Sequence, residues 1–401
     1  MKIIHVLGHN AKWNIDSFLE QRIGDGFLIT AFTFGKKFMS HKQLNRLLEK
    51  CMLDLQFYGK KAKLKAGKLL EFDFHPTNGN PFDVTNVFIH NCIKQAIQFQ
   101  IDLGFKEIII PICYESDNCE EIIQNITIIN AHVSKNRQEG IKYFLTLPFS
   151  FDIIRDQEIV DRILIAATDK KIDFDGYNIV CENKPEQGHK INTDSKLITN
   201  LSTVFKTLKY QGFETIYSYA NWDAIIYLAQ TDIDYITIGS YENLRNFSIK
   251  RFTEDISGGA SKGYYFSEKL LNMIRAQDII QIQVNGMIPA IQNEKNIFSD
   301  IILATDYIWN IHKPDVNKNY LLSISRLLSK ISQIKDIRQR TLHVLFLIQD
   351  AIICYKDLDD HYIALAGSES KNYHLESWKM YLLKTIGMKP DEFITTYKKL
   401  S

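Results

Sequence analysis

The stretch that decides the fold is Asp232-Ile-Asp-Tyr-Ile-Thr-Ile-Gly239, followed further along by Ser257-Gly-Gly-Ala-Ser-Lys-Gly263. Its centre, 235–238, is apolar with β-branched and aromatic side chains, which is typical of a buried parallel strand. A glycine-rich loop then precedes a short aromatic segment at 263–266. In an α/β barrel this order places backbone amides and cations beside the ends of strands seven and eight, where the fold commonly binds phosphate. The stretch therefore predicts a barrel with a site at the carboxyl ends of its strands.

Six earlier segments have the same strand character. They are 27–34, 69–75, 107–113, 143–148, 176–181 and 215–219, and a further short strand could lie at 2–7. Helical patterns separate most of them, and Gly104, Gly140 and Gly212 end three of these helices directly before the next strand. Eight alternating units favour a closed (β/α)8 barrel of the TIM type over an open doubly wound sheet.

The pattern changes near residue 295. Four segments, 297–313, 318–332, 337–356 and 373–387, have apolar residues at helical spacing without a strand between them. We therefore expect a barrel domain at 1–290 and an all-helical subdomain at 291–401, which covers the barrel or provides an oligomer face. The basic residues of this region recur at helical spacing among acids, so we interpret them as a solvated face. They are Lys313, Lys318, Arg326, Lys330, Lys335, Arg338 and Arg340.

Composition narrows the class of protein. The 48 basic and 47 acidic side chains give a net charge of +1, so no global field recruits nucleic acid or an acidic membrane. The six cysteines form no Cys-x-x-Cys pair, and no apolar segment reaches the length of a membrane span. No signal peptide is recognisable at Met1. We expect a soluble, reduced, cytoplasmic protein.

Polar residues at the ends of the predicted strands are the catalytic candidates. The segment 69–75 ends Glu71-Phe-Asp-Phe-His75, and strand alternation places its three ionisable side chains on one face. Carboxylates and an imidazole in such positions can act as acid, base or nucleophile. The alternative for each is a residue that caps a loop or satisfies a buried amide. The candidates are Asp73, His75, Glu115, Glu182 and Asp223.

A second set of residues is suited to an anion. Two guanidiniums and an ammonium beside a glycine-rich loop fit a phosphate, although the loop is neither a Walker A motif nor a dinucleotide fingerprint. The alternative is a surface loop beside an exposed basic helix. Trp222 could stack on a sugar or base, or simply pack, and Glu242 could instead begin a helix. The predicted phosphate- and substrate-binding residues are Arg245, Arg251, Ser261, Lys262, Trp222, Asn183 and Glu242.

Metal chemistry has weaker support. His5 and His9 have helical ligand spacing but lie in a β-like segment beside Gly8, so a shared metal is not expected. No cofactor is predicted, and a magnesium ion held by Asp73, Glu115 or Glu182 is left open.

Two functions follow from these patterns. The first is a barrel enzyme that acts on a phosphorylated small molecule, nucleotide or phosphosugar, by acid/base-assisted hydrolysis or transfer at a glycosidic or phosphoester bond. The alternative is a non-catalytic barrel that binds a protein or nucleic-acid partner through its helical segment. Salt-dependent nucleic-acid binding would favour the alternative, and thermal stabilisation by phosphorylated ligands would favour the enzyme.

Overall fold

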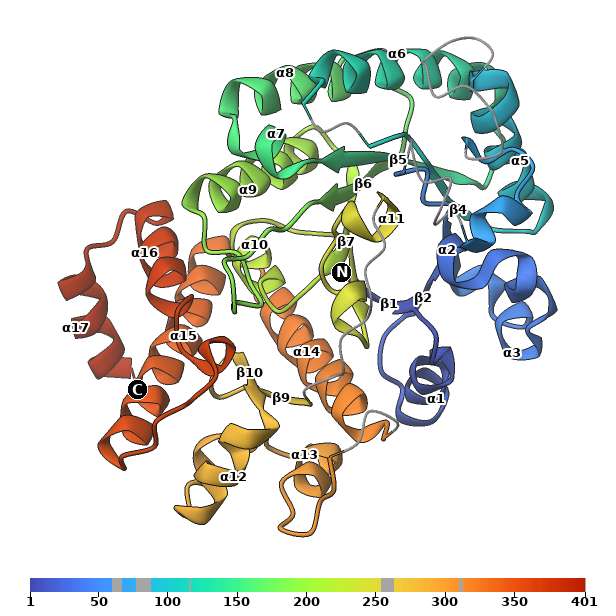
Figure 1. Cartoon of the computed structure of the whole chain (residues 1–401). Coiled ribbons are helices and arrows are strands. Elements are labelled where there is room, and N and C mark those ends of the chain that lie inside the picture. Colours follow the sequence, from blue (N-terminus) through green and yellow to red (C-terminus); the bar gives the residue numbers. More distant parts are fainter. Residues whose placement is uncertain (60–66, 77–87, 115–116, 254–262, 310–312, 401) are drawn as a thin grey trace. The chain divides into compact units, whose positions relative to one another are not determined.

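The computed structural model describes residues 1–59, 67–76, 88–114, 117–253, 263–309 and 313–400 (Figure 1). The chain forms two compact units. The first comprises Met1–Asn183, Thr199–Ala220 and Asp232–Gly258, and the second comprises Lys184–Ile198, Asn221–Thr231 and Gly259–Ser401. The division at residue 290 stays a prediction.

The first unit is a barrel of eight parallel strands. They are β1 (Lys2–Leu7), β2 (Gly26–Thr30), β3 (Cys51–Asp54), β4 (Glu107–Ile110), β5 (Lys142–Phe149), β6 (Gly176–Cys181), β7 (Glu214–Ala220) and β8 (Tyr235–Gly239). Their hydrogen-bonded order is β3-β2-β1-β8-β7-β6-β5-β4, and β3 also lies beside β4. This cyclic order is that of a nearly closed (β/α)8 barrel, which confirms the predicted fold class.

The barrel interior is a packed core. One buried hydrophobic cluster contains a residue from every strand, in chain order Ile4, Leu28, Met52, Ile109, Phe144, Val180, Ile216 and Tyr235. Because side chains alternate along a strand, these positions define the inward face, and the next inward positions lead toward the carboxyl ends. Asp54 of β3 and Glu182 after β6 each lie two residues beyond such a position.

Helices form the outer layer of the barrel (Figure 1). They are α1 (Ala11–Gln21), α2 (Ala31–Phe34), α3 (Lys42–Asn45), α5 (Lys94–Asp102), α6 (Cys119–Asn136), α7 (Phe151–Arg155) and α8 (Gln157–Ala167). The short helix α11 (Lys250–Thr253) instead lies close to the strands, and its Phe252 belongs to the core cluster. Amphipathic sequence explains the longer ones. In α8, for example, Val160, Ile163, Leu164 and Ala167 are buried, and Asp156 caps the first turn by accepting from the Ile159 amide. Helix α9 (Ser195–Tyr210) lies partly in each unit.

Two predicted strands are wrong. The segment 69–75 contains a 3-10 helix, η3 (Gly67–Glu71), and a turn. Its alternating pattern reflects Phe72 and Phe74, which pack on Phe99 with ring centroids 5.6 and 5.5 Å away. The inward strand face expected for Asp73 and His75 therefore does not exist. The third barrel strand is instead β3, which is only four residues long.

The predicted eighth strand at 263–266 is also outside the barrel. Strand β9 (Tyr264–Ser267) pairs antiparallel with β10 (Asn272–Arg275) in a separate two-stranded sheet. Short aromatic strands look alike in sequence whether they join a parallel barrel or a hairpin. The count of eight is restored because 2–7 forms β1, the central neighbour of β2 and β8.

The second unit is mainly helical. Its helices are α10 (Ala224–Gln230), α12 (Ala276–Val284), α13 (Ile297–Ile302), α14 (Asp315–Gln333), α15 (Ile337–Asp360), α16 (Leu375–Thr385) and α17 (Pro390–Leu400). From α13 onward no strand occurs among the described residues, as the helical spacing predicts. None of the helices in the described part of the chain combines the length and hydropathy needed to span a membrane.

Arg340 corrects the interpretation of the basic residues in this unit. Its side chain is 0% exposed and donates to the backbone carbonyls of Ile334 (2.7 Å) and Leu228 (3.1 Å). The solvated face predicted for this set is therefore wrong at this position. Helical spacing placed Arg340 among exposed residues, but the carbonyls at the end of α10 hold it inside.

Candidate functional site

The amino-terminal end of the barrel is occupied by ion pairs. Lys142 Nζ lies 2.6 Å from Glu214 Oε1, and Lys2 Nζ lies 3.1 Å from Glu107 Oε1. Tyr235 donates a hydrogen bond of 2.6 Å to Glu107 from the barrel interior. These ion pairs neutralise one another. The candidate active site is therefore at the opposite end of the barrel, where Asp54 and Glu182 follow the inward-facing positions of their strands.

Asp54 is the centre of a buried polar cluster at that carboxyl end. Its carboxylate accepts hydrogen bonds from the Tyr219 hydroxyl (2.6 Å), the Gln56 amide (2.9 Å) and the Tyr58 hydroxyl (3.2 Å). Gln56 Nε2 in turn donates to the Tyr219 hydroxyl at 2.7 Å. Because Asp54 ends β3 and Tyr219 lies near the end of β7, the cluster joins strands on different parts of the barrel mouth.

The backbone at this cluster is held in an unusual conformation. Gln56 and Tyr219 both have positive φ, 55° and 56°, which costs about 1 kcal/mol or more for a residue with a side chain. At Tyr219 the strain coincides with a register shift between β7 and β8, and such a bulge can re-aim a side chain. The bulge directs the Tyr219 hydroxyl to the carboxylate of Asp54. Strained non-glycine residues concentrate at functional sites, so two of them on one carboxylate mark this cluster.

Burial controls the proton affinity of Asp54. The side chain is 1% exposed, and this desolvation raises its pKa to about 6, although the hydrogen bonds from Tyr219, Gln56 and Tyr58 and the charge of Arg251 act in the opposite direction. A carboxyl group with such a pKa changes protonation close to neutral pH, which suits a general acid or base. The pKa values of Tyr58 and Tyr219 are raised well above 10 by burial and by Asp54, so both phenols stay protonated as donors.

Arg251 supplies positive charge at the same mouth. Its guanidinium lies 5.2 Å from the ring centroid of Phe32 and 5.8 Å from that of Phe252. Burial is the largest influence and lowers the pKa of Arg251, although the negative charge of Asp54 acts in the opposite direction. Its hydrogen bonds, both 3.3 Å, go to the neutral oxygens of Thr33 and of the Asn243 backbone. A guanidinium held between aromatic rings and bonded to neutral oxygens is well suited to an anion.

A second carboxylate follows β6. Glu182 is buried, and its Oε2 accepts from the Tyr114 hydroxyl at 2.7 Å and from the Phe151 amide at 3.4 Å. Burial first, and then the hydrogen bond to Glu182, raise the pKa of Tyr114, which therefore remains a donor. Asn183, the residue after Glu182, donates its backbone N–H to the backbone carbonyl of Phe247 at 3.2 Å.

Aromatic side chains close the mouth over both carboxylates. Phe247 is 3% exposed and lies among Tyr58, Tyr114 and Tyr219, with ring centroids 4.9, 5.9 and 5.7 Å away. It comes from the segment after β8 that leads to α11, shown in yellow in Figure 1. Both carboxylates are therefore shielded from solvent in this structure.

The structure brings some of the predicted site residues to this mouth. Glu182, Asn183 and Arg251 lie there. His75 is buried beside the Asp54 cluster, with its Nε2 3.4 Å from the backbone carbonyl oxygen of Gln56. Burial lowers the pKa of His75 to about 4, so it is neutral at pH 7. Arg245 is half-buried in the segment after β8, while Glu242 in the same segment and Asp73 in the turn after η3 are exposed.

Other predicted residues lie elsewhere. Trp222 and Asp223 belong to the second unit, where the indole is buried against Phe266 and the Asp223 carboxylate accepts from the Asn221 amide at 3.2 Å. Glu115, Ser261 and Lys262 lie outside the described residues. The roles predicted for all these residues stay predictions. In the described part of the chain, no three or more His, Cys, Asp or Glu side chains are grouped to hold a metal ion.

Sequence reasoning missed the centre of the site. Asp54 ends a four-residue strand that follows charged residues, so neither length nor alternation identified it. Its signal was an apolar run ending in aspartate and followed by Gln56, Phe57 and Tyr58. Tyr219 could not have been found, because only the bulge turns its side chain inward.

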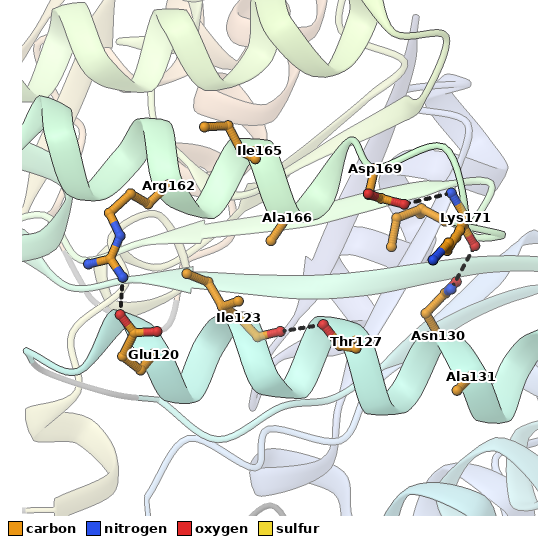
Figure 2. Close-up of a pocket in the computed structure, with 11 residues that line it drawn as sticks. Glu120, Ile123, Thr127, Asn130, Ala131, Arg162, Ile165, Ala166, Asp169 and Lys171 are labelled. Atoms are coloured by element: carbon orange, nitrogen blue, oxygen red, sulfur yellow. Dashed lines mark hydrogen bonds and ion pairs between the residues drawn. The ribbon is translucent and has the colours of Figure 1, made fainter.

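A groove on the outside of the barrel is a different kind of feature. It has a volume of about 620 Å³ and runs between α6 and α8 (Figure 2). Figure 2 shows Ile123 and Ala166 between the two helices, with Glu120 and Arg162 paired with each other at one end. None of the predicted site residues lines it. We therefore place the candidate site at the barrel mouth.

Replacing Tyr219 by Phe tests the electrostatics of the Asp54 cluster. Loss of the phenol removes the shortest hydrogen bond to the carboxylate, so we expect the pKa of Asp54 to rise further above 6, by about one unit. Carbon-13 NMR titration of labelled aspartate side chains measures this pKa directly. Tyr58→Phe is the matched control and should produce a smaller rise, because its bond is longer. An Asp54 pKa that is unchanged in Tyr219→Phe would contradict the proposed coupling.

Comparison with known proteins gives little further information. No family model matches the chain, and no curated protein matches it. A solved structure described as a probable tagatose 6 phosphate kinase from Sinorhizobium meliloti 1021 aligns over 98% of this chain and 99% of that chain. The identity is 11% and the TM-score 0.33, a level that supports no conclusion about fold or function. The barrel rests on the strand order alone.

Proposed function

We propose that the chain is a barrel enzyme that acts on a phosphorylated small molecule, nucleotide or phosphosugar. The reaction is acid/base-assisted hydrolysis or transfer at a glycosidic or phosphoester bond. The observation that carries the proposal is Asp54: a buried carboxyl group at the end of a barrel strand, with its pKa raised to about 6 and held by two residues of strained backbone. A carboxyl group with a purely structural role rarely combines a raised pKa with strained backbone around it.

Each group has a role in this proposal. Asp54 donates or accepts the proton, and the phenol of Tyr219 fixes its orientation through the 2.6 Å hydrogen bond. Glu182 supplies the second carboxylate, which stabilises positive charge that develops on the substrate or activates water. Arg251 binds the phosphate. Arg245, Ser261 and Lys262 remain proposed further contacts to the anion.

The test is an activity screen combined with one substitution. Wild-type protein is incubated with nucleoside phosphates, sugar phosphates and phosphodiesters, and released phosphate, sugar or base is quantified. For any substrate found, Asp54→Asn is expected to lower turnover by about a hundredfold or more, because the amide cannot transfer the proton. Circular dichroism and thermal melting show whether the variant is folded.

Two further variants make the result specific. Asp161→Asn changes an exposed carboxylate on α8 and should leave turnover unchanged. Asp73→Asn tests the carboxylate that sequence analysis favoured. A folded and fully active Asp54→Asn protein would refute the role of Asp54, and loss of activity only in Asp73→Asn would transfer it to that residue.

A further inference from the structure

Phe247 occupies the middle of the barrel mouth although no strand carries it. Its ring packs among those of Tyr58, Tyr114 and Tyr219, and its centroid lies 6.1 Å from the ring centroid of Phe252. The carboxylate of Asp54 is bonded to two of these tyrosines and the carboxylate of Glu182 to the third. The ring of Phe247 is therefore surrounded by other aromatic rings, three of which are hydrogen-bonded to the two carboxylates.

The backbone of Phe247 is attached to the end of β6. The backbone carbonyl of Phe247 accepts a hydrogen bond from the backbone N–H of Asn183, and Phe247 forms an isolated parallel bridge with Glu182. Two neighbouring acceptors have no donor among the described residues. They are the buried Oδ1 atoms of Asn183 and of Asn246, the residue before Phe247. A buried carbonyl oxygen without a donor costs about 1–3 kcal/mol, so these two oxygens can accept hydrogen bonds from N–H groups of a ligand.

We propose that Phe247 stands in the ring-binding subsite of the substrate, and that the substrate is a phosphorylated compound with a planar heteroaromatic ring, as in a nucleotide. This inference rests on the proposed function and narrows its substrate class. The segment after β8 withdraws Phe247 when the substrate enters, and the ring of the substrate takes its place. N–H groups on the ring edge donate to Asn183 and Asn246, and the phosphate binds Arg251.

The lining favours a ring over a bare sugar phosphate. Offset and edge-to-face contacts between aromatic rings occur at centroid distances of about 4.5–7 Å, and the four rings around Phe247 lie within that range. A sugar needs many hydrogen-bonding partners around its hydroxyls, whereas the Phe247 ring is packed mainly against aromatic rings, and the hydroxyls of the three tyrosines among them already donate to Asp54 and Glu182. Exchange of one aromatic ring for another keeps that surface covered, so opening costs little once the ligand is present.

The experiment measures binding by isothermal titration calorimetry with three kinds of probe. AMP and UMP carry both ring and phosphate, adenosine carries only the ring, and ribose 5-phosphate carries only the phosphate. Phe247→Ala removes the competing ring, so its affinity for AMP, UMP or adenosine is expected to rise about tenfold or more over wild type. Ribose 5-phosphate should bind both proteins within about threefold.

Control variants separate this effect from general loosening of the barrel. Phe247→Leu keeps apolar burial and should give a smaller gain, which protects the test if the alanine variant is unstable. Phe174→Ala removes another buried phenylalanine, which precedes β6 and packs on Tyr177 at 6.0 Å, and should give no gain. Arg251→Met should weaken AMP and ribose 5-phosphate but leave adenosine unchanged.

The outcomes distinguish the two proposals. The inference is overturned if ring compounds bind the Phe247 variants no better than wild type, or if ribose 5-phosphate gains equally. In either case a ribose 5-phosphate affinity that depends on Arg251 would leave the proposed function standing. Failure of all phosphorylated probes to bind any of these proteins would count against both.

Discussion

Acidification from pH 7 to pH 5 is expected to destabilise the protein by several kilocalories per mole. Burial lowers the pKa of His5 to about 4, of His75 to about 4 and of His374 to about 3. Each is therefore neutral in the native chain but is protonated below about 6.5 once the chain unfolds. Because the unfolded state binds more protons, stability is complete above pH 6.5 and falls as the pH decreases toward 4. Linkage gives roughly 2 kcal/mol per histidine at pH 5.

The surroundings of these histidines explain why they do not simply acquire a charge. His374 donates from Nε2 to the Leu271 carbonyl at 2.9 Å, and its buried Nδ1 has no partner among the described residues. His5 is a fully buried residue of β1, and its Nδ1 lies 3.5 Å from Asn14 Nδ2. No carboxylate among these contacts stabilises an imidazolium, so protonation requires local opening.

Asp54 opposes this trend. Its pKa is raised from 3.8 to about 6 in the native chain, so between these values the native state binds the additional proton and gains stability as the pH falls. The gain is about 1 kcal/mol at pH 5, which is smaller than the combined loss from the histidines. The net effect is therefore acid lability.

Urea unfolding at a series of pH values measures the effect, followed by far-UV circular dichroism and tryptophan fluorescence. The ring centroid of His374 lies 4.5 Å from that of Trp378, so opening around this histidine changes the fluorescence contributed by Trp378. His374→Gln should flatten the dependence between pH 7 and pH 5, whereas His361→Gln, at an exposed position, should not. Equal stability at both pH values would contradict the neutral buried state of these histidines.

Replacing Arg340 by Met is expected to destabilise the second unit by about 3 kcal/mol or more. The guanidinium donates to the carbonyls of Leu228 (3.1 Å) and Thr231 (3.3 Å) at the carboxyl end of α10, and to Ile334 at 2.7 Å. The last carbonyls of a helix have no partner within the helix and carry its partial negative charge. Methionine retains the apolar stem but leaves these buried carbonyls without a donor.

Arg338→Met is the matched control for this prediction. Arg338 lies two residues earlier in α15 and is exposed, with one hydrogen bond of 3.1 Å to the Ile386 carbonyl. We expect its loss to change the free energy of unfolding by about 0.5 kcal/mol or less. Urea denaturation monitored by Trp222 and Trp378 gives both values. Similar small effects for the two variants would show that Arg340 does not hold the end of α10.

The same pair of arginines illustrates how sequence and structure divide the information. Both occur at helical spacing among acids, and nothing in that pattern distinguishes the exposed guanidinium from the buried one. Likewise, the alternation in 69–75 is compatible with a strand, but the phenylalanines that produce it pack on α5 from a 3-10 turn. Local periodicity records which side chains are apolar, and it does not record what they pack against.

By itself, the sequence predicted an eight-unit α/β barrel with a helical region after it, although the segments 69–75 and 263–266 that it counted as strands are not part of the barrel. It placed the candidate polar groups where the strands end. Buried parallel strands and glycine-ended helices are local properties, and they recur often enough along the chain to define the fold. It also identified Glu182, Asn183 and Arg251 as residues near those ends.

Only the tertiary structure decided which residues meet there. Asp54 is distinguished by its desolvation and by the Tyr219 hydroxyl from a remote part of the chain, Tyr219 by a bulge that turns it inward, and Phe247 by a segment that folds back over the mouth. The Asp54–Tyr219 hydrogen bond and the packing of Phe247 on Tyr58 join residues more than a hundred positions apart. Such contacts form only when the barrel closes, and the pKa of Asp54 is a property of that closed arrangement.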